Sequence, residues 1–367
     1  MSESVMSNAL TRPVMIMAGG TGGHVYPALA IADELQRRGI PVVWMGTKKG
    51  IEARLVPEAG IEVDWLGMSG LRGKGIFTLL LAPLKIIIAC SQALKILKKR
   101  RPSVVLGMGG FVSAPGGLMA WLINIPLLIH EQNAIPGMSN RLLSKIANKV
   151  MQAFPDSFNK QSQYVGNPVR REIIELAAPE ERNKERQGAL RLLVFGGSLG
   201  AMRLNEIVPQ MCAQLINDEP LVIKHQAGPG HFDQTKQNYA KLNVKAEVLE
   251  YIDNMAEMYA WADLVICRAG AMTIAEIAAA GVASVLVPYP YAVDDHQTFN
   301  AKYLSDSGAA ILIKQEDMSV ASLLEILKGI DREKTLMMSI KARQLGMPDS
   351  THLVTDACLI AGGYDVN

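Results

Sequence analysis

The sequence predicts an α/β protein of two doubly wound domains that face each other across a cleft, and three observations predict it. Short apolar runs alternate with longer amphipathic segments through the 367 residues, a pattern typical of parallel sheets with helices on both faces. The pattern restarts after a charged stretch at 178–188. Both halves open with a strand, a run of glycines and a helix, which indicates two similar units. We expect one domain over 1–166 and the other over 167–345.

The expected strands are the apolar runs themselves. In the first half they are 14–18, 41–46, 61–66, 103–109, 126–130 and 148–152, and in the second half 190–195, 221–226, 246–251, 263–268 and 284–289. Open α/β sheets bind their ligands at the carboxyl ends of the strands. The cleft between two such sheet edges is therefore the expected site.

The net charge, aromatic content and cysteine spacing exclude several classes of protein. A net charge of +2 and an aromatic content of 5% give no global basis for binding nucleic acid. The cysteines, Cys90, Cys212, Cys267 and Cys358, form no zinc or redox pair, which predicts reduced and mostly buried thiols in the cytosol. The first apolar run leads directly into glycines and predicts a strand rather than a signal peptide.

The most apolar stretch, 75–102, is interrupted by Pro83 and Lys85, so it falls short of the roughly 20 apolar residues that span a membrane. One interpretation is a core helix whose terminal cations suit the helix dipole. The other is a surface that dips into one face of a bilayer and binds anionic headgroups. The cations concerned are Lys95, Lys98, Lys99, Arg100 and Arg101.

Each half holds two glycine turns before a helix, at 19–23 and 107–117 and at 196–200 and 267–276. Glycine lets a ligand approach the N–H groups of a helix N-terminus, which favours phosphate, although tight packing alone also explains a single glycine turn. Four such turns predict two phosphorylated ligands. The first turn is not a dinucleotide fingerprint, because Val25 stands where the third glycine belongs and no acidic residue ends the second strand.

The turn at 196–200, "GGSLG", also matches the G-x-S-x-G elbow of α/β hydrolases. In that hypothesis Ser198 is the nucleophile, and Asp263 and His296 are available as its partners. It leaves the repeated glycine turns unexplained. In the preferred interpretation Ser198 donates its hydroxyl to a phosphate.

Glu276 also has two interpretations. Thr273 and Glu276 have the spacing of a capping box at a helix start. Alternatively, Glu276 accepts both hydroxyls of a ribose while Gly270 lets the nucleotide come close. No Asp-x-Asp pair occurs in the sequence, so we expect no metal of that kind and assign the charge of a departing diphosphate to helix dipoles and Arg170.

Polar residues follow the apolar strands at the same predicted sheet edge. His24 ends the first glycine turn and is either a packed helix residue or a proton acceptor aimed into the cleft. The run "HEQN" at 130–133 is either a satisfied turn or a segment that hydrogen-bonds a sugar. The segment 288–301 repeats this pattern in the second half, with Asp295, His296, Gln297 and Asn300.

Several segments, in order, resemble the MurG-type glycosyltransferases of bacterial cell-wall synthesis over nearly the whole chain. They are "AGGTGGHVYPALA", "GLRGKG", "GMGGFVSAPGG", "HEQNAIPG", "VGNPVR", "GGSLGA", "ICRAGAMTIAE" and "DDHQTFNA". The resemblance implies a GT-B fold of two Rossmann-like domains. It places the lipid acceptor on the first domain and UDP-N-acetylglucosamine (UDP-GlcNAc) mainly on the second, with the last helix, within 346–367, packed back on the first.

The resemblance also implies a set of site residues. Glu276 would bind the ribose, Ile252 the uracil through its backbone, and Gln297 the sugar hydroxyls. The other implied donor contacts are Thr21, Gly22, Gly23, Asn133, Arg170, Ser198, Ala271, Met272, Thr273, Ile274 and Ala275. Ala275 stands where some relatives have serine, so a hydroxyl contact from that position is absent here. The candidate catalytic residues are His24, Glu276 and Asn133, with His24 as the base or as a contact of the acceptor diphosphate.

The implied reaction is an inverting transfer of N-acetylglucosamine from UDP-GlcNAc to the C4 hydroxyl of undecaprenyl-diphospho-N-acetylmuramoyl-pentapeptide, with neither cofactor nor metal. The implied location is peripheral, on the cytoplasmic face of the inner membrane, with anionic lipid and cell-wall synthesis or division proteins as partners. A UDP-sugar 2-epimerase of the same architecture and a nucleotide-binding regulator without catalysis remain alternatives. The apolar and basic stretch at 75–101 counts against the epimerase.

Overall fold

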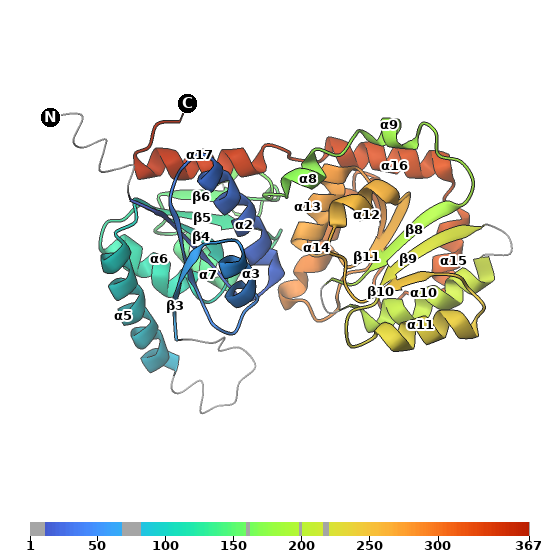
Figure 1. Ribbon diagram of the computed structural model, residues 1–367, viewed down its shortest axis with the longest axis horizontal. Coiled ribbons are helices and arrows are strands. Elements are labelled where there is room, and N and C mark those ends of the chain that lie inside the picture. Colours follow the sequence, from blue (N-terminus) through green and yellow to red (C-terminus); the bar gives the residue numbers. More distant parts are fainter. Residues whose placement is uncertain (1–11, 68–81, 159–161, 198–199, 216–219, 367) are drawn as a thin grey trace. The chain divides into compact units, whose positions relative to one another are not determined.

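The structure is a computed structural model that describes residues 12–67, 82–158, 162–197, 200–215 and 220–366 (Figure 1). The chain forms two compact units, one made of Met1–Val169 with Pro348–Asn367 and the other of Arg170–Met347. Each unit contains one sheet in which all strand pairs are parallel. The predicted α/β class is therefore confirmed.

The sheet of the first unit has the strand order β3-β2-β1-β4-β5-β6-β7. Its strands are β1 (Val14–Ala18), β2 (Val42–Gly46), β3 (Glu62–Trp65), β4 (Val104–Gly109), β5 (Leu127–Glu131), β6 (Lys149–Gln152) and β7 (Gln163–Tyr164). Its helices are α2 (Gly22–Arg37), α3 (Glu52–Glu58), α5 (Ala82–Arg100), α6 (Ser113–Leu122), α7 (Met138–Leu143) and α17 (Ser350–Gly362).

Strand β1 lies at the centre of this sheet, and all five of its residues are buried. Because side chains alternate between the faces of a strand, Ile16 joins one hydrophobic core with α2 and α17, while Met17 joins a second core with α5 and α6. The helices that follow β1 and β4 therefore cover opposite faces of the sheet. This reversal places the ends of β1 and β4 where ligands bind in doubly wound folds.

The C-terminal helix α17 belongs to the first unit and packs against α2 (Figure 1). Val354 and Cys358 of this helix enter the core beside β1. Beyond the helix, the hydroxyl of Tyr364 accepts a hydrogen bond from Ser103 Oγ at 3.0 Å and donates one to the carbonyl of Arg12. The chain end is thus joined to the start of the sheet.

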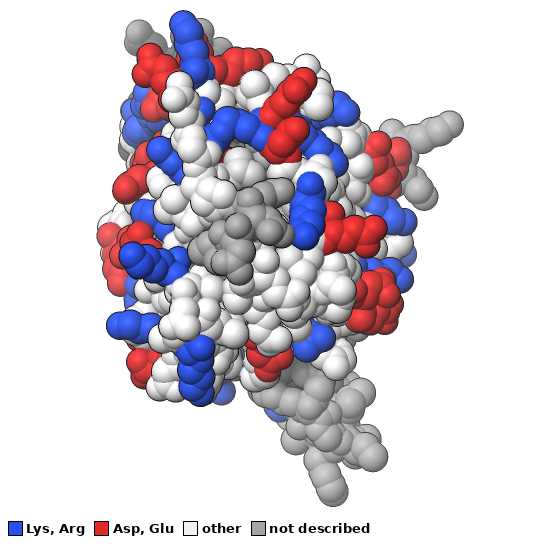
Figure 2. Space-filling view, turned by 90° about the vertical axis from the view of Figure 1, so that its right-hand side faces the viewer, with Lys and Arg blue, Asp and Glu red and all other residues white. Residues whose placement is uncertain are grey.

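The sheet of the second unit has the order β10-β9-β8-β11-β12-β13. Its strands are β8 (Leu190–Phe195), β9 (Leu221–Gln226), β10 (Glu247–Leu249), β11 (Leu264–Cys267), β12 (Ala283–Leu286) and β13 (Ala310–Leu312). Its helices are α8 (Arg171–Ile174), α9 (Pro179–Asn183), α10 (Met202–Leu215), α11 (Phe232–Lys241), α12 (Met255–Trp261), α13 (Ala271–Ala280), η1 (Val293–Asp295), α14 (His296–Ser305), α15 (Val320–Lys328) and α16 (Arg332–Gln344). On the face of this unit that Figure 2 shows, basic and acidic side chains are intermixed.

Every strand expected from the sequence is present, and two short edge strands were missed. The missed strands are β7 and β13. β7 has only two residues, and β13 has three at the edge of its sheet. Runs this short give no period-2 pattern that a sequence can reveal.

The apolar stretch predicted to be helical contains α5 from Ala82 onward, and residues 68–81 lie outside the described part of the chain. Among the described helices, none is long and apolar enough to cross a bilayer. All four cysteines are free, and three of them, Cys212, Cys267 and Cys358, are buried as predicted, whereas Cys90 is half-buried.

Candidate functional site

The four predicted glycine turns lie at the carboxyl ends of the two central strands of each sheet. In the first unit the turns follow β1 and β4, which are hydrogen-bonded neighbours, and in the second they follow β8 and β11, which are also neighbours. These are the places where the direction of strand winding reverses. Each unit therefore carries one candidate site, built from two adjacent turns.

In the first unit the two turns touch through their backbones. A Cβ atom at position 110 would lie 2.3 Å from the carbonyl oxygen of Gly19, and Gly110 also has a φ of +81°. Only glycine meets both conditions. Ser113, fully buried, links the same turns because its Oγ accepts from Gly109 N at 3.1 Å and lies 3.1 Å from the carbonyl of Met17.

A buried carboxylate that the sequence did not reveal, Glu52, holds the β1–α2 turn. Its Oε2 accepts a hydrogen bond from Gly20 N at 2.9 Å, and its Oε1 accepts from Thr47 N at 3.0 Å and Thr47 Oγ at 2.7 Å. A Cβ at Gly50 would lie 1.9 Å from this carboxylate. The N–H of Gly20 is therefore engaged by a negative charge and is not part of a phosphate cradle.

Thr21, Gly22 and Gly23 form the start of α2, with Thr21 as the N-cap residue. The space around Gly23 is open, since a Cβ there would meet only Thr21 Oγ1, at 3.8 Å. A glycine inside a helix costs about 0.5–1 kcal/mol relative to alanine, and packing gives no reason for it here. This is the point of the first turn where a ligand can come closest to the helix N-terminus.

His24 is half-buried, with its ring packed on Gly109. A Cβ at Gly109 would lie 2.8 Å from both Nδ1 and Cε1 of His24. Nδ1 is 2.8 Å from Oε1 of Gln132, so the predicted "HEQN" segment reaches the predicted base. The sequence placed both at one sheet edge, and the structure brings them into contact.

Glu131 and Asn133 of "HEQN" make hydrogen bonds that fix the loop that follows β5. Glu131 is buried and accepts from Asn133 N at 3.0 Å, Asn133 Nδ2 at 3.2 Å, and from Gly137 N and Asn140 Nδ2 at 3.0 Å each. The carbonyl of Asn133 accepts from Ser157 Oγ at 3.1 Å. The position of Asn133 at the edge of β5 is thus fixed by a buried charge.

In the second unit the helix that carries most of the predicted donor contacts is α13. It begins at Ala271 after the N-cap residue Gly270, and no side chain caps it. Thr273 is the third residue of the helix, so the capping-box interpretation of Thr273 and Glu276 is wrong. A Cβ at Gly270 would meet only Thr273 Oγ1, at 3.6 Å, which leaves the helix N-terminus open to a ligand.

Both carboxylate oxygens of Glu276 have partners. Oε1 accepts from Arg170 Nη2 at 3.2 Å, and Oε2 accepts from the hydroxyl of Tyr259 at 3.1 Å. Burial raises the pKa of Glu276, while Arg170 and Tyr259 oppose that rise. Burial and the neighbouring Glu276 raise the pKa of the Tyr259 phenol well above its ordinary value. Glu276 and Arg170 were predicted site residues, but Tyr259 was missed because only the fold brings α12 and α13 together.

The loop that precedes α14 is held by the side chains of Gln297, on that helix, and of Arg268. Gln297 Oε1 accepts from Tyr289 N at 2.9 Å, and Arg268 Nη1 donates to the carbonyls of Val287 and Pro288 at 3.1 Å each. Asp294 and Asp295 both have left-handed backbone conformations, with φ of +52° and +51°. Non-glycine residues rarely adopt this conformation, and it is often found at functional sites.

Two further predicted donor contacts lie elsewhere in the sequence. Ile252 is buried three residues beyond β10, and Ser198 lies outside the described residues.

The position of Asp263 excludes it as the acidic partner in the hydrolase hypothesis. This residue lies immediately before β11, at the amino edge of the sheet, whereas the "GGSLG" turn follows β8 at the carboxyl edge. Its buried carboxylate accepts from Arg186 Nη1 at 2.6 Å, Arg332 Nη1 at 3.2 Å and Arg191 N at 2.9 Å. Asp263 is a structural anchor and cannot orient a histidine beside Ser198.

Within the described residues, no three His, Cys, Asp or Glu side chains come together as ligands of a metal ion. Several charged side chains hold the two sites in place through hydrogen bonds. They are Glu52 and Glu131 in the first unit and Glu276 and Arg170 in the second.

Comparison with known proteins identifies the family. Residues 14–152 match the glycosyltransferase family 28 N-terminal domain, and residues 191–354 match the glycosyltransferase family 28 C-terminal domain. The chain is 50% identical to a protein of Dechloromonas aromatica over 349 residues, covering 95% of this chain and 99% of that one. It is 50% identical to a protein of Thiobacillus denitrificans over 361 residues, with coverage of 95% and 98%. Both are named UDP-N-acetylglucosamine–N-acetylmuramyl-(pentapeptide) pyrophosphoryl-undecaprenol N-acetylglucosamine transferase.

Solved structures agree with this result. MurG of Acinetobacter baumannii superposes with a TM-score of 0.84 at 41% identity and covers 95% of this chain and 99% of its own. A UDP-GlcNAc 2-epimerase of Neisseria meningitidis gives a TM-score of 0.66 at 12% identity, with coverage of 95% and 100%, and this likeness shows the fold alone. The predicted two-domain GT-B fold is confirmed. The chain is a glycosyltransferase that belongs to family 28 and, within it, to the MurG family of N-acetylglucosamine transferases.

Proposed function

We propose that this protein transfers N-acetylglucosamine from UDP-GlcNAc to the C4 hydroxyl of undecaprenyl-diphospho-N-acetylmuramoyl-pentapeptide, with inversion at the anomeric carbon. The observation that carries this proposal is 50% identity, over 95% of the chain, to transferases named for that donor and that acceptor. The two sites support it, because each unit has a helix N-terminus opened by a glycine at the carboxyl edge of its sheet.

The donor is assigned to the second unit. The ribose hydroxyls donate to Glu276, whose charge is held in place by Arg170 and Tyr259. The backbone of Ile252 binds the uracil. The N-terminus of α13 (the run Ala271 to Glu276 with its N-cap Gly270) supplies N–H groups and a positive dipole end for the diphosphate, and Arg170 adds a full positive charge. Gln297 and the loop before it bind the sugar hydroxyls.

The acceptor is assigned to the first unit. At the carboxyl edge of that unit's sheet, Thr21, Gly22 and Gly23 at the N-terminus of α2 contact the incoming donor, as does Asn133, which Glu131 holds in place. His24 takes the proton of the C4 hydroxyl as the new bond forms between that oxygen and the anomeric carbon of the donor. The bond from that carbon to UDP breaks in the same step, and the charge on UDP is stabilised by α13 and Arg170 without a metal.

The membrane side is assigned to α5, α6 and α7, which pack side by side in the first unit. These helices leave large apolar side chains exposed, namely Leu84, Ile86, Ile87 and Ile88 on α5, Leu118, Trp121 and Leu122 on α6, and Met138 and Leu142 on α7. Such a concentration of exposed apolar residues marks an interaction surface. We assign it to the headgroup region of the cytoplasmic face of the inner membrane, where the lipid acceptor lies and where proteins of cell-wall synthesis or division are partners.

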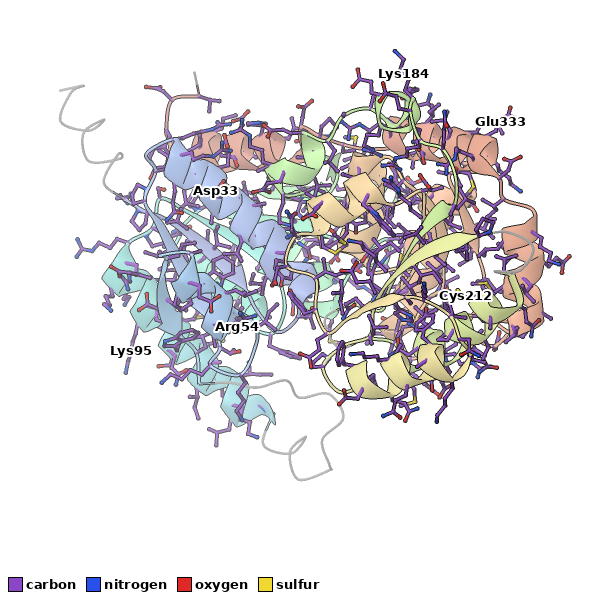
Figure 3. The ribbon with its side chains drawn as sticks, turned by 45° about the vertical axis from the view of Figure 1, so that its right-hand side comes forward. Asp33, Arg54, Lys95, Lys184, Cys212 and Glu333 are labelled. Atoms are coloured by element: carbon purple, nitrogen blue, oxygen red, sulfur yellow. The ribbon has the colours of Figure 1, made fainter. Side chains whose placement is uncertain are left out.

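The cations expected to bind anionic headgroups differ in whether they are paired, and Lys99 and Arg101 are exposed. Arg100 donates to Asp64 at 2.6 Å and to Glu62 at 2.5 Å, and Lys99 Nζ lies 3.5 Å from Asp64. Glu62 and Asp64 of β3 therefore pair Arg100 and offset part of the positive charge at this end of α5. Lys95 and Lys98 are exposed, and Lys95 points outward from the helix in Figure 3. We assign the electrostatic contribution to these two lysines, to Lys99 and Arg101, and to Lys85, which is also exposed.

Transfer itself is tested with UDP-[14C]GlcNAc and a short-chain analogue of the lipid acceptor, in the presence of EDTA. We expect label in the lipid product at the same rate with and without EDTA, because the charge of the leaving UDP is stabilised by protein groups. Transfer that requires added Mg²⁺ would contradict the metal-free mechanism only. Absence of transfer under both conditions, by folded protein, would overturn the proposed function.

The ribose contact is tested by Glu276→Gln, with UDP affinity measured by calorimetry. A hydrogen bond to a charged group is worth about 1.5–3 kcal/mol, so we expect affinity to fall roughly 10- to 100-fold. Because burial raises the pKa of Glu276, the affinity of the unmodified protein should also decrease as the pH falls through that pKa. Glu257→Gln, at an exposed position on α12, is the matched control. Equal UDP affinity of both variants would remove Glu276 from the donor site.

The membrane surface is tested by Ile87→Glu, since Ile87 is the most exposed isoleucine of α5, at 64%. Removing one buried apolar side chain costs about 1.5–3 kcal/mol, so binding to phosphatidylglycerol-containing vesicles should weaken at least about tenfold, with UDP affinity unchanged. Met337→Glu, on exposed Met337 of α16, should bind vesicles like the unmodified protein. If Ile87→Glu binds equally well, α5 is not the membrane surface.

A further inference from the structure

A chain of hydrogen bonds runs behind His24 into the interior of the first unit. His24 Nδ1 lies 2.8 Å from Gln132 Oε1, and Gln132 Nε2 lies 3.1 Å from both Nδ1 and the carbonyl oxygen of His130. His130 Nε2 lies 2.9 Å from the carbonyl oxygen of Gly166. Gln132 and His130 are both fully buried.

Two backbone carbonyls fix which atom donates in each of these hydrogen bonds, because a carbonyl oxygen can only accept. Gly166 O requires a proton on Nε2 of His130, which leaves Nδ1 of that neutral ring as an acceptor. The carbonyl of His130 requires the amide nitrogen of Gln132 on its side, and the same amide donates to His130 Nδ1. Oε1 of Gln132 must then face His24, and it accepts from a proton on His24 Nδ1.

We propose that His130 and Gln132 are positioning residues that hold His24 in the tautomer with its proton on Nδ1, so that Nε2 carries the lone pair that accepts the substrate proton. This inference rests on the proposed transferase function with His24 as base. A ring with the proton on Nε2 has no lone pair to offer from that atom. Among the described residues, no side chain or backbone group hydrogen-bonds Nε2 of His24.

The surroundings keep this arrangement intact at neutral pH. Burial lowers the pKa of His130 to about 4, so its Nδ1 stays unprotonated and accepts from Gln132. The backbone on each side is fixed, since Asn140 Nδ2 donates to the carbonyl of His130 and Asn167 Nδ2 to the carbonyl of Gln132, each at 3.0 Å. Packing on Gly109 restricts the rotation of the His24 ring.

The tautomer is tested by nuclear magnetic resonance on the full chain labelled with [15N]histidine, without substrate. We expect a protonated, pyrrole-like shift for His24 Nδ1 and an unprotonated, pyridine-like shift for Nε2. The His24 signals are assigned by their loss in His24→Gln. A proton on Nε2 in the unmodified protein would overturn the inference, and it would do so whether or not the protein transfers sugar.

The positioning role is tested by Gln132→Met, which removes the acceptor of His24 and keeps the side-chain length. We expect the protonated signal to leave Nδ1, and kcat to fall by up to about tenfold with unchanged KM for UDP-GlcNAc, because the tautomer is then selected by no neutral hydrogen bond to Nδ1. Gln132→Glu keeps the acceptor for His24 Nδ1 but loses the amide donor to His130, and it should retain the Nδ1 proton and more activity than Gln132→Met.

Gln152→Met is the matched control for the loss of a buried amide. Gln152, on β6 of the same sheet, accepts from Phe158 N at 2.8 Å and Ser162 Oγ at 2.9 Å. Its replacement should leave the His24 shifts in place. A normal kcat in Gln132→Met would overturn the positioning role. If the unmodified protein shows the Nδ1 proton and no transfer, the tautomer assignment stands and the proposed function fails.

Discussion

The close approach of Gly110 to the carbonyl of Gly19 is the constraint on which the first site depends. Helices α2 and α6 leave β1 and β4 toward opposite faces of the sheet, so the two turns lie next to each other at its carboxyl edge. Any Cβ at position 110 would force them apart. Their contact brings Gly109 against the ring of His24, and thereby fixes where the candidate base lies relative to the buried chain of Gln132 and His130.

Buried carboxylates then fix the backbone around each site. Glu52 holds the first glycine turn and Glu131 the loop of Asn133, each through hydrogen bonds from N–H groups. Such charges are stable in the interior only when they are fully hydrogen-bonded. Glu276 differs, because both of its partners are side chains, those of Arg170 and Tyr259, and no backbone N–H of the described residues holds it. Buried and hydrogen-bonded carboxylates thus hold the backbone or side chains of the candidate site in each unit.

The sequence predicted the features that depend on local pattern. Apolar runs located the strands β1–β6 and β8–β12, and the glycine turns located both sheet edges. Features that depend on tertiary contacts were missed or misread. Glu52 and Tyr259 carry no local signal, and Thr273 with Glu276 had the spacing of a cap although α13 begins at Ala271. The cationic end of α5 looked free in the sequence because nothing in it shows that Asp64 of β3 lies beside Arg100.

We propose that the first unit supplies the proton acceptor and that the second unit holds the donor. The most direct test of this assignment is the single-turnover rate of sugar transfer by His24→Ala, measured together with UDP affinity. A general base contributes about 10²- to 10⁴-fold to the rate of a reaction. The account predicts a fall in the rate of that order with unchanged UDP affinity. An unchanged rate, or a loss of rate that follows entirely from a loss of UDP affinity, would contradict it.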